Sequence, residues 1–153
     1  MITISEKSIF NVAIRDVFDA ERNISLHVET QKHRGEVAVA GVTSGLIEKG
    51  EEVEWLATHF GIKQRLRVRI AEMEKPVFFR VEMVFGAFKS FRHDHRFRDM
   101  GKNRTEKSDQ MWIEAPMGFL GRIAELVFLG PYMRRFLKNK NAGLKILLEK
   151  KRP

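Results

Sequence analysis

The chain has 153 residues, 43% hydrophobic and 31% charged, and this balance predicts one folded domain over residues 1–153 rather than a disordered chain. The absence of cysteine excludes disulfides and thiolate metal sites, and the net charge of +8 favours anionic partners without specifying one. The first ten residues lack a signal-peptide pattern and no apolar run is long enough for a bilayer, so we expect a cytoplasmic protein.

The N-terminal part of the chain predicts one strand followed by two short helices. Residues 1–10, "MITISEKSIF", are β-rich enough for an edge strand. From Asn11 onward the apolar residues take helical spacing, with a break near "ERN" (21–23). We expect Asn11 to cap the first of the two helices, because its side chain can accept a hydrogen bond from the first turn.

Residues 35–114 predict a series of antiparallel strands. The clearest stretch is "IKQRLRVRI" (62–70), in which apolar and basic residues alternate strictly. Alternation of this kind indicates a strand with one face on the core and the other in solvent. Short turns with glycine or polar residues separate the successive strands, which is typical of an antiparallel meander.

After Pro116 the apolar spacing becomes helical and predicts a long amphipathic C-terminal helix. Gly130-Pro131 should kink or break this helix, because proline lacks a backbone donor and clashes with the preceding turn. Only this helix is long enough to cover one face of the predicted sheet. Its apolar positions recur three or four residues apart: Phe119, Ile123, Leu126, Val127, Met133, Phe136 and Leu137.

This order of elements resembles the helix-grip fold of the START and birch-pollen-allergen-like superfamily, also called SRPBCC. Three stretches resemble its bacterial polyketide cyclase/dehydrase-like ligand-binding group: "GLIEKGEEVEWLATHFGI", "EMVFGAFKSFRHDHRF" and "EAPMGFLGRIAELVFLGPYM". The resemblance implies an α+β fold in which a curved antiparallel sheet of about seven strands wraps around the C-terminal helix. It also implies a hydrophobic cavity for a small apolar or amphipathic molecule, such as a lipid, quinone or polyketide. Only some members are enzymes, and neither a cofactor nor an obligate protein partner is implied.

The stretch "FRHDHRF" (91–97) places His93 and His95 on the apolar face of a strand. If the following hairpin is centred near Gly101, His93 lies opposite Asp109 and His95 lies opposite Lys107. A His93–Asp109 pair could be a satisfied polar fixture of the cavity wall. It could also transfer protons in a cyclase or dehydratase, because a carboxylate fixes the histidine tautomer and raises its pKa.

A metal site at these histidines is the weaker interpretation. His59 or Asp109 would have to supply the third ligand, and the ammonium group of Lys107 would repel a cation. We therefore expect no metal. Lys107 itself departs from the resembled group, whose T-x-M-x-D pattern has methionine there, whereas this chain reads Thr105-Glu106-Lys107-Ser108-Asp109. An inward Lys107 would make the cavity more polar or more open.

The inward positions of the strands and helix, together with the resemblance, predict the residues that form the cavity. Aromatic and methionine side chains around a few polar groups are the usual form of a small-molecule site. The predicted set is Trp55, His59, Phe79, Val81, Met83, Phe91, His93, His95, Phe97, Lys107, Asp109, Met111, Ile123 and Val127.

The remaining charged residues predict solvent-exposed surfaces. Glu52 and Glu54 alternate with apolar residues, so we expect them outside, paired with the basic stripe of residues 63–69. Nucleic-acid binding is disfavoured, because the aromatic residues that stacking requires fall mostly on the inner face. The basic C-terminal helix could make transient contact with an anionic membrane surface. No nucleophile elbow, dinucleotide fingerprint or phosphate-binding loop is present.

Overall fold

Seven strands form one antiparallel sheet in the computed structural model, which describes residues 1–59 and 61–150. The order across the sheet is β1-β7-β6-β5-β4-β3-β2, so β2 to β7 form the expected meander and β1 pairs with the last strand. The strands are β1 (Ile2–Phe10), β2 (Val37–Gly41), β3 (Glu52–His59), β4 (Ile62–Glu74), β5 (Phe78–Phe85), β6 (Ser90–Gly101) and β7 (Arg104–Glu114).

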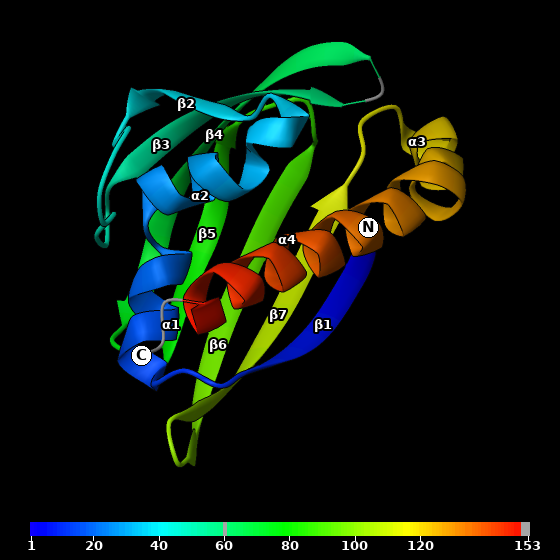
Figure 1. Cartoon of the computed structure of the whole chain (residues 1–153). Coiled ribbons are helices and arrows are strands. Elements are labelled where there is room, and N and C mark those ends of the chain that lie inside the picture. Colours follow the sequence, from blue (N-terminus) through cyan, green and yellow to red (C-terminus); the bar gives the residue numbers. More distant parts are fainter. Residues whose placement is uncertain (60, 151–153) are drawn as a thin grey trace.

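The helices lie on one face of this curved sheet, as Figure 1 shows, with the long C-terminal helix running across its concave side. The expected α+β helix-grip arrangement is therefore confirmed. None of the described helices combines the length and the apolar character needed to cross a membrane. The helical elements are α1 (Ile14–Glu21), α2 (Ile24–Gln31), the 3-10 turn η1 (Lys32–Arg34), α3 (Gly118–Ala124), the π-helix η2 (Glu125–Leu129) and α4 (Gly130–Lys150).

The first of the two short helices begins differently from the sequence prediction, whereas the break before the second lies where it was expected. The first helix has Ala13 at its N-cap, without a side-chain capping bond, so the expected cap by Asn11 is wrong. The backbone N–H of Asn11 instead donates to Glu149 Oε1, near the end of α4. The break between the helices lies at Asn23, whose side chain accepts a hydrogen bond from the backbone N–H of Leu26.

The C-terminal helix is interrupted close to the predicted place. The π-helix η2 ends at Leu129, directly before Gly130 and Pro131, and α4 begins at Gly130. Proline cannot donate to the preceding turn, so the α-helical hydrogen-bond pattern cannot run through this point unchanged. The interruption divides the helix into a short part near the end of β7 and a long part across the sheet (Figure 1).

The β6–β7 hairpin has a different register from the one expected. Lys102 and Asn103 form its two-residue turn, with φ of 55° and 53°, which is the type I′ geometry that suits a tight hairpin. The turn thus lies beyond Gly101, and opposite residues shift by two: His95 faces Asp109, His93 faces Met111, and Phe97 faces Lys107. The predicted register, with His93 directly opposite Asp109 and His95 directly opposite Lys107, is therefore wrong.

Two hydrophobic clusters form the core. One packs α1 against the middle of the sheet, where Phe18 contacts Phe79 and Phe97 edge-on at ring-centroid distances of 5.6 and 5.3 Å. The other packs α4 against β1 and β7 and includes Ile113 and Leu137. Neither cluster fills the whole space under α4.

Candidate functional site

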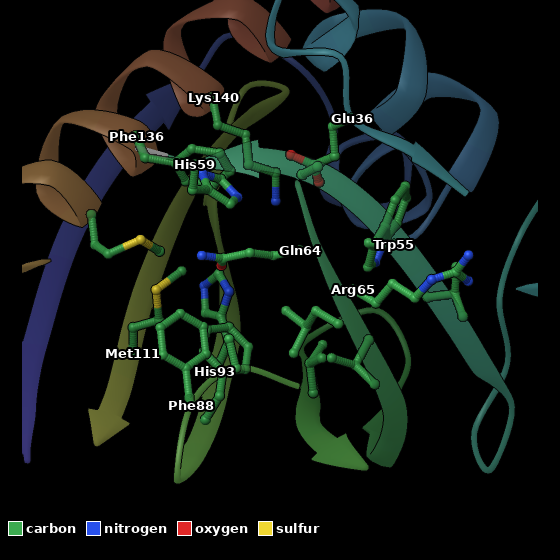
Figure 2. Close-up of a pocket in the computed structure, with 18 of the residues that line it drawn as sticks. Glu36, Trp55, His59, Gln64, Arg65, Phe88, His93, Met111, Phe136 and Lys140 are labelled. Atoms are coloured by element: carbon green, nitrogen blue, oxygen red, sulfur yellow. The ribbon is translucent and has the colours of Figure 1, made fainter. Parts of the chain in front are cut away.

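A cavity of about 700 Å³ lies between the concave face of the sheet and the helices. Figure 2 shows Phe136 and Lys140 reaching toward it from α4, with His93 and Met111 on the sheet side. The main apolar side chains of its wall come from both core clusters, from α4 and from the segment between β5 and β6: Trp55, Phe79, Val81, Phe88, Phe91, Met111, Met133 and Phe136.

The structure divides the predicted cavity residues into two groups. One group lines the cavity and consists of Trp55, His59, Phe79, Val81, Phe91, His93, His95 and Met111. The other group lies outside the lining and consists of Met83, Phe97, Lys107, Asp109, Ile123 and Val127. The sheet positions were thus placed better than the helix positions.

The positions expected from the C-terminal helix need correction. Ile123 and Val127 are 45% and 57% exposed, so they face away from the cavity. Their immediate neighbours Ala124 and Phe128 are on the lining instead, and the wall continues along the helix with Leu129, Met133 and Phe136. The apolar spacing indicated an amphipathic helix but could not show that its first part has an outward apolar face.

Phe97 and Met83 also lie outside the lining for local reasons. Phe97 is buried against Phe18 of α1, so this helix fills the space that the side chain was expected to border. Met83 lies near the end of β5, where its sulfur is close to Gly86.

His93 contacts Asp109 despite the shifted register. Its Nε2 lies 2.8 Å from Asp109 Oδ1, reaching diagonally across the two strands. An ionised carboxylate can only accept, so His93 Nε2 carries the proton and Nδ1 is left as an acceptor. His95 stacks on His93 with ring centroids 3.7 Å apart, and its Nδ1 lies 3.1 Å from the same carboxylate oxygen.

Lys107 is completely buried beneath these histidines. Its Nζ lies 2.8 Å from Asp109 Oδ2 and 3.1 Å from Glu21 Oε2, and it donates to Asn141 Oδ1 at 2.7 Å. Asn141 in turn donates from Nδ2 to Asp109 Oδ2 at 2.9 Å. Lys107 therefore belongs to a closed polar network between β7, α1 and α4, and it does not open the cavity.

Lys140 joins the same network from the cavity side. Its Nζ donates to Glu21 Oε1 at 2.6 Å, and both residues are part of the cavity lining. We call the group Glu21, His93, His95, Lys107, Asp109, Lys140 and Asn141 the buried polar network. Two carboxylates face two ammonium groups in it, so its formal charge balances when both histidines are neutral.

Burial and pairing shift the pKa values of this network. Burial lowers the pKa of His95 to about 3, helped by His93 and opposed by Asp109, and burial also lowers the pKa of His93. Burial alone would lower the pKa of Lys107, but Asp109 and Glu21 outweigh it and raise that pKa. Conversely, burial would raise the pKa of Asp109, but Lys107, His93 and His95 together outweigh it and hold that pKa well below its ordinary value.

These groups can be judged as metal ligands from their surroundings. The ligand atoms of His93, His95 and Asp109 all lie within 4.8 Å of one another, close enough to share an ion. The second oxygen of Asp109 is, however, already held by the Lys107 ammonium and by Asn141. An added cation would lie beside that ammonium, so the donors fit a hydrogen-bonded network better than a metal centre.

Two further pairs of polar side chains line the cavity outside the buried polar network. His59 Nδ1 lies 2.6 Å from the Tyr132 hydroxyl, and burial lowers the pKa of His59. His27 Nε2 lies 2.6 Å from Glu36 Oε1, and the His27 ring packs on Trp55 with centroids 4.3 Å apart. These groups give the otherwise apolar cavity a few fixed polar points.

The sequence prediction missed several lining residues, most clearly Glu21, Glu36, Tyr132 and Lys140. Lys140 had a usable pattern, because it follows Met133 and Phe136 at helical spacing and interrupts an apolar stripe. Glu21 and Glu36 had no such pattern. Their place on the cavity lining depends on how the helical segment from α1 to η1 packs against the sheet.

The outer face of the sheet agrees with the expectation of paired charges. Arg65 donates to Glu54 at 2.6 Å, and Arg67 and Arg69 each donate to Glu52 at the same distance. The predicted pairing of Glu52 and Glu54 with the basic stripe is confirmed. The expected solvent exposure is wrong for Glu54, which is buried at 7% exposure under its arginine partners. These carboxylates lie on the face opposite the cavity.

Comparison with known proteins shows the fold. No protein-family model and no curated protein matches the sequence. Among solved structures, a protein from Thermus thermophilus superposes with a TM-score of 0.79 at 14% identity, over 97% of this chain and 98% of its own. A START superfamily protein from Mycobacterium smegmatis gives 0.73 at 10% identity, over 97% of each chain. Ara h 8.0201 gives 0.69 at 10% identity, over 97% of this chain and 98% of its own.

Proposed function

Because the chain has the helix-grip fold of START superfamily proteins, we propose that it binds a small hydrophobic or amphipathic molecule, such as a lipid, quinone or polyketide, between sheet and α4. The observation that carries this proposal is the cavity of about 700 Å³. Ligand pockets commonly measure about 300–1,000 Å³ and combine an apolar wall with a few fixed polar groups.

The distribution of polar groups supports an amphipathic ligand. The apolar body of the ligand would lie along Trp55, Phe79 and Phe91. Its polar end would meet Lys140, His93 and His95, which lie together on the lining. Lys140 donates to Glu21 through one of its three N–H groups, so it can still donate to a bound hydroxyl, carbonyl or carboxylate.

The experiment is a binding titration with cis-parinaric acid, a naturally fluorescent long-chain fatty acid, supported by native mass spectrometry against lipids, quinones and aromatic polyketides. Ala57 is buried on the cavity lining, while the adjacent Thr58 is exposed on the other face of β3. Ala57→Trp places an indole in the cavity and should weaken binding by about tenfold or more, about 1.4 kcal/mol or more. Thr58→Trp is the matched control and should bind like the unmodified protein.

Equal affinity of the Ala57→Trp and Thr58→Trp variants would place any binding outside the cavity. If the protein bound no ligand of any tested class, the proposal itself would be contradicted. If Ala57→Trp does not fold, Val81→Trp on β5 tests the same cavity, with Val84→Trp on the exposed face of that strand as its control.

A second function, proton transfer on a polyketide-like substrate as in a cyclase or dehydratase, is favoured by the 2.8 Å contact between His93 and Asp109. A neutral histidine on a cavity wall, oriented by a carboxylate, can act as a general base. In this alternative, His93→Gln would lower kcat by roughly 100-fold or more while leaving substrate binding largely intact. A ligand that is recovered chemically unchanged after long incubation would favour the carrier.

A further inference from the structure

The segment of residues 117–128, which we call the apolar segment, exposes large hydrophobic side chains to solvent. Met117 is 75% exposed, Phe119 77%, Leu120 63%, Leu126 73% and Phe128 64%. Isolated exposed apolar residues are ordinary, but a contiguous set on one element marks an interaction site.

This outward orientation follows from how the segment is attached. A Cβ on Gly121 would lie 2.1 Å from the carbonyl oxygen of Pro116, so only glycine permits this approach. On the same inner side, Glu125 is buried and its Oε1 accepts a hydrogen bond from the backbone N–H of Ala115 at 2.7 Å. The small and polar side of the segment is thus fixed to the protein, and most of the surface of its large apolar side chains is exposed to solvent.

The apolar segment borders the ligand cavity. Met117, Ala124 and Phe128 belong to the segment and also to the cavity lining. Figure 1 shows α3 at the end of the sheet where β7 leads into the C-terminal helix. A surface that covers this segment would therefore lie at the edge of the cavity.

The charge around the apolar segment is positive. Arg122 within it and Arg134, Arg135 and Lys138 on α4 are all exposed. Between residues 116 and 148 the sole acidic residue is Glu125, which is buried. An exposed apolar helix face flanked by cations is the pattern of helices that lie in the surface of an anionic bilayer.

We propose that the apolar segment docks onto an anionic lipid bilayer and brings the edge of the cavity to the membrane, where an apolar ligand is taken up or released. This inference rests on the proposed ligand-binding function. A second copy of the chain fits less well, because a self-association through this surface would bring the cations of both copies together. A bilayer supplies both an apolar layer and anionic headgroups.

The test is co-sedimentation of the full chain with vesicles of phosphatidylglycerol and phosphatidylcholine, compared with phosphatidylcholine alone. We expect binding to the anionic vesicles, weaker binding at high salt, and little binding to the neutral ones. The double variant Phe119→Ser/Leu126→Ser should bind about tenfold or more weakly, because two apolar side chains no longer enter the bilayer. Arg134→Gln/Arg135→Gln should bind less and lose most of its salt dependence.

The control is Ile146→Ser on α4, which removes a side chain that is 56% exposed and lies 18 positions beyond Phe128. This variant should bind vesicles like the unmodified protein. Equal vesicle binding by all variants, or no vesicle binding at all, would overturn the proposal. So would a concentration-dependent dimer, seen by analytical ultracentrifugation, that Phe119→Ser/Leu126→Ser abolishes, because a second copy would then cover the segment.

The cis-parinaric acid titration separates this inference from the proposed function. Phe119→Ser/Leu126→Ser should retain fatty-acid binding in solution while losing vesicle binding. A protein that binds the fatty acid but no vesicle contradicts membrane docking and leaves the cavity function standing. A protein that binds neither contradicts both.

Discussion

The buried polar network and the apolar segment invert the usual distribution of residues. The network places Lys107 and Asp109 in the interior with no more than 2% exposure, while the segment leaves Phe119 77% exposed. The difference lies in partners, because each charge of the network meets an opposite charge or an amide, whereas most of the segment's apolar face is exposed to solvent. Substituting a residue of the buried polar network should therefore lower the free energy of unfolding strongly. Substituting an exposed residue of the apolar segment should change it little.

The largest expected effect comes from replacing Lys107 with the methionine that the resembled group carries there. Lys107→Met leaves Asp109 buried without its cation and removes one of the two ammonium groups near Glu21. Breaking a buried ion pair from one side costs about 3–5 kcal/mol, so the free energy of unfolding should fall by that amount. Urea unfolding monitored by circular dichroism measures the change.

The companion variant is Lys107→Met/Asp109→Asn, in which the carboxylate is neutralised as well. It should recover part of the lost stability, and the double-mutant cycle gives the coupling between the two side chains. A change within about 0.5 kcal/mol for Lys107→Met alone would show that water or movement satisfies Asp109 without the lysine.

The sequence could predict the elements that depend on local patterns, but not the contacts that depend on residues far apart in the chain. Strict alternation in residues 62–70 and the helical spacing after Pro116 were sufficient for the meander, the long helix and much of the sheet side of the cavity. The register of β6–β7 depended on the positive φ angles of Lys102 and Asn103, which no hydrophobic pattern specifies. The sequence pattern does not explain Lys107, because its partners Glu21 and Asn141 are far away along the chain.

The helix positions were harder to predict for a similar reason. Ile123 and Val127 have the spacing of core residues, yet the inner side of that turn is taken by Gly121 and Glu125. Periodicity identifies the apolar face of a helix but not whether the protein or another surface covers it.

A smaller change in stability per pH unit should appear when acid protonates the network. The pKa of His95 is about 3 in the folded protein and about 6.5 in the unfolded chain, because burial disfavours its charged form. Below pH 6.5 the unfolded chain therefore binds a proton that the folded protein does not, and stability falls as the pH falls toward 3. The carboxylates of Glu21 and Asp109, whose pKa values are lowered by Lys107 against the effect of burial, add to this loss below their ordinary range.

Urea unfolding over this pH range measures the slope. His95→Gln should reduce this slope by up to about 1.4 kcal/mol per pH unit, which is the contribution of one proton, since glutamine does not titrate. An unchanged slope in that variant would assign the acid sensitivity to His93 and the carboxylates.

The smallest expected effect concerns the stability of the apolar segment. Phe119 and Leu126 are 77% and 73% exposed, so neither loses much packing when it is shortened. Phe119→Ser/Leu126→Ser should change the free energy of unfolding by about 0.5 kcal/mol or less, as surface substitutions usually do. Urea unfolding without lipid measures it, with Ile146→Ser as the exposed control. A loss of several kcal/mol would mean that the apolar side chains support the fold themselves, and the contrast with the buried polar network would then disappear.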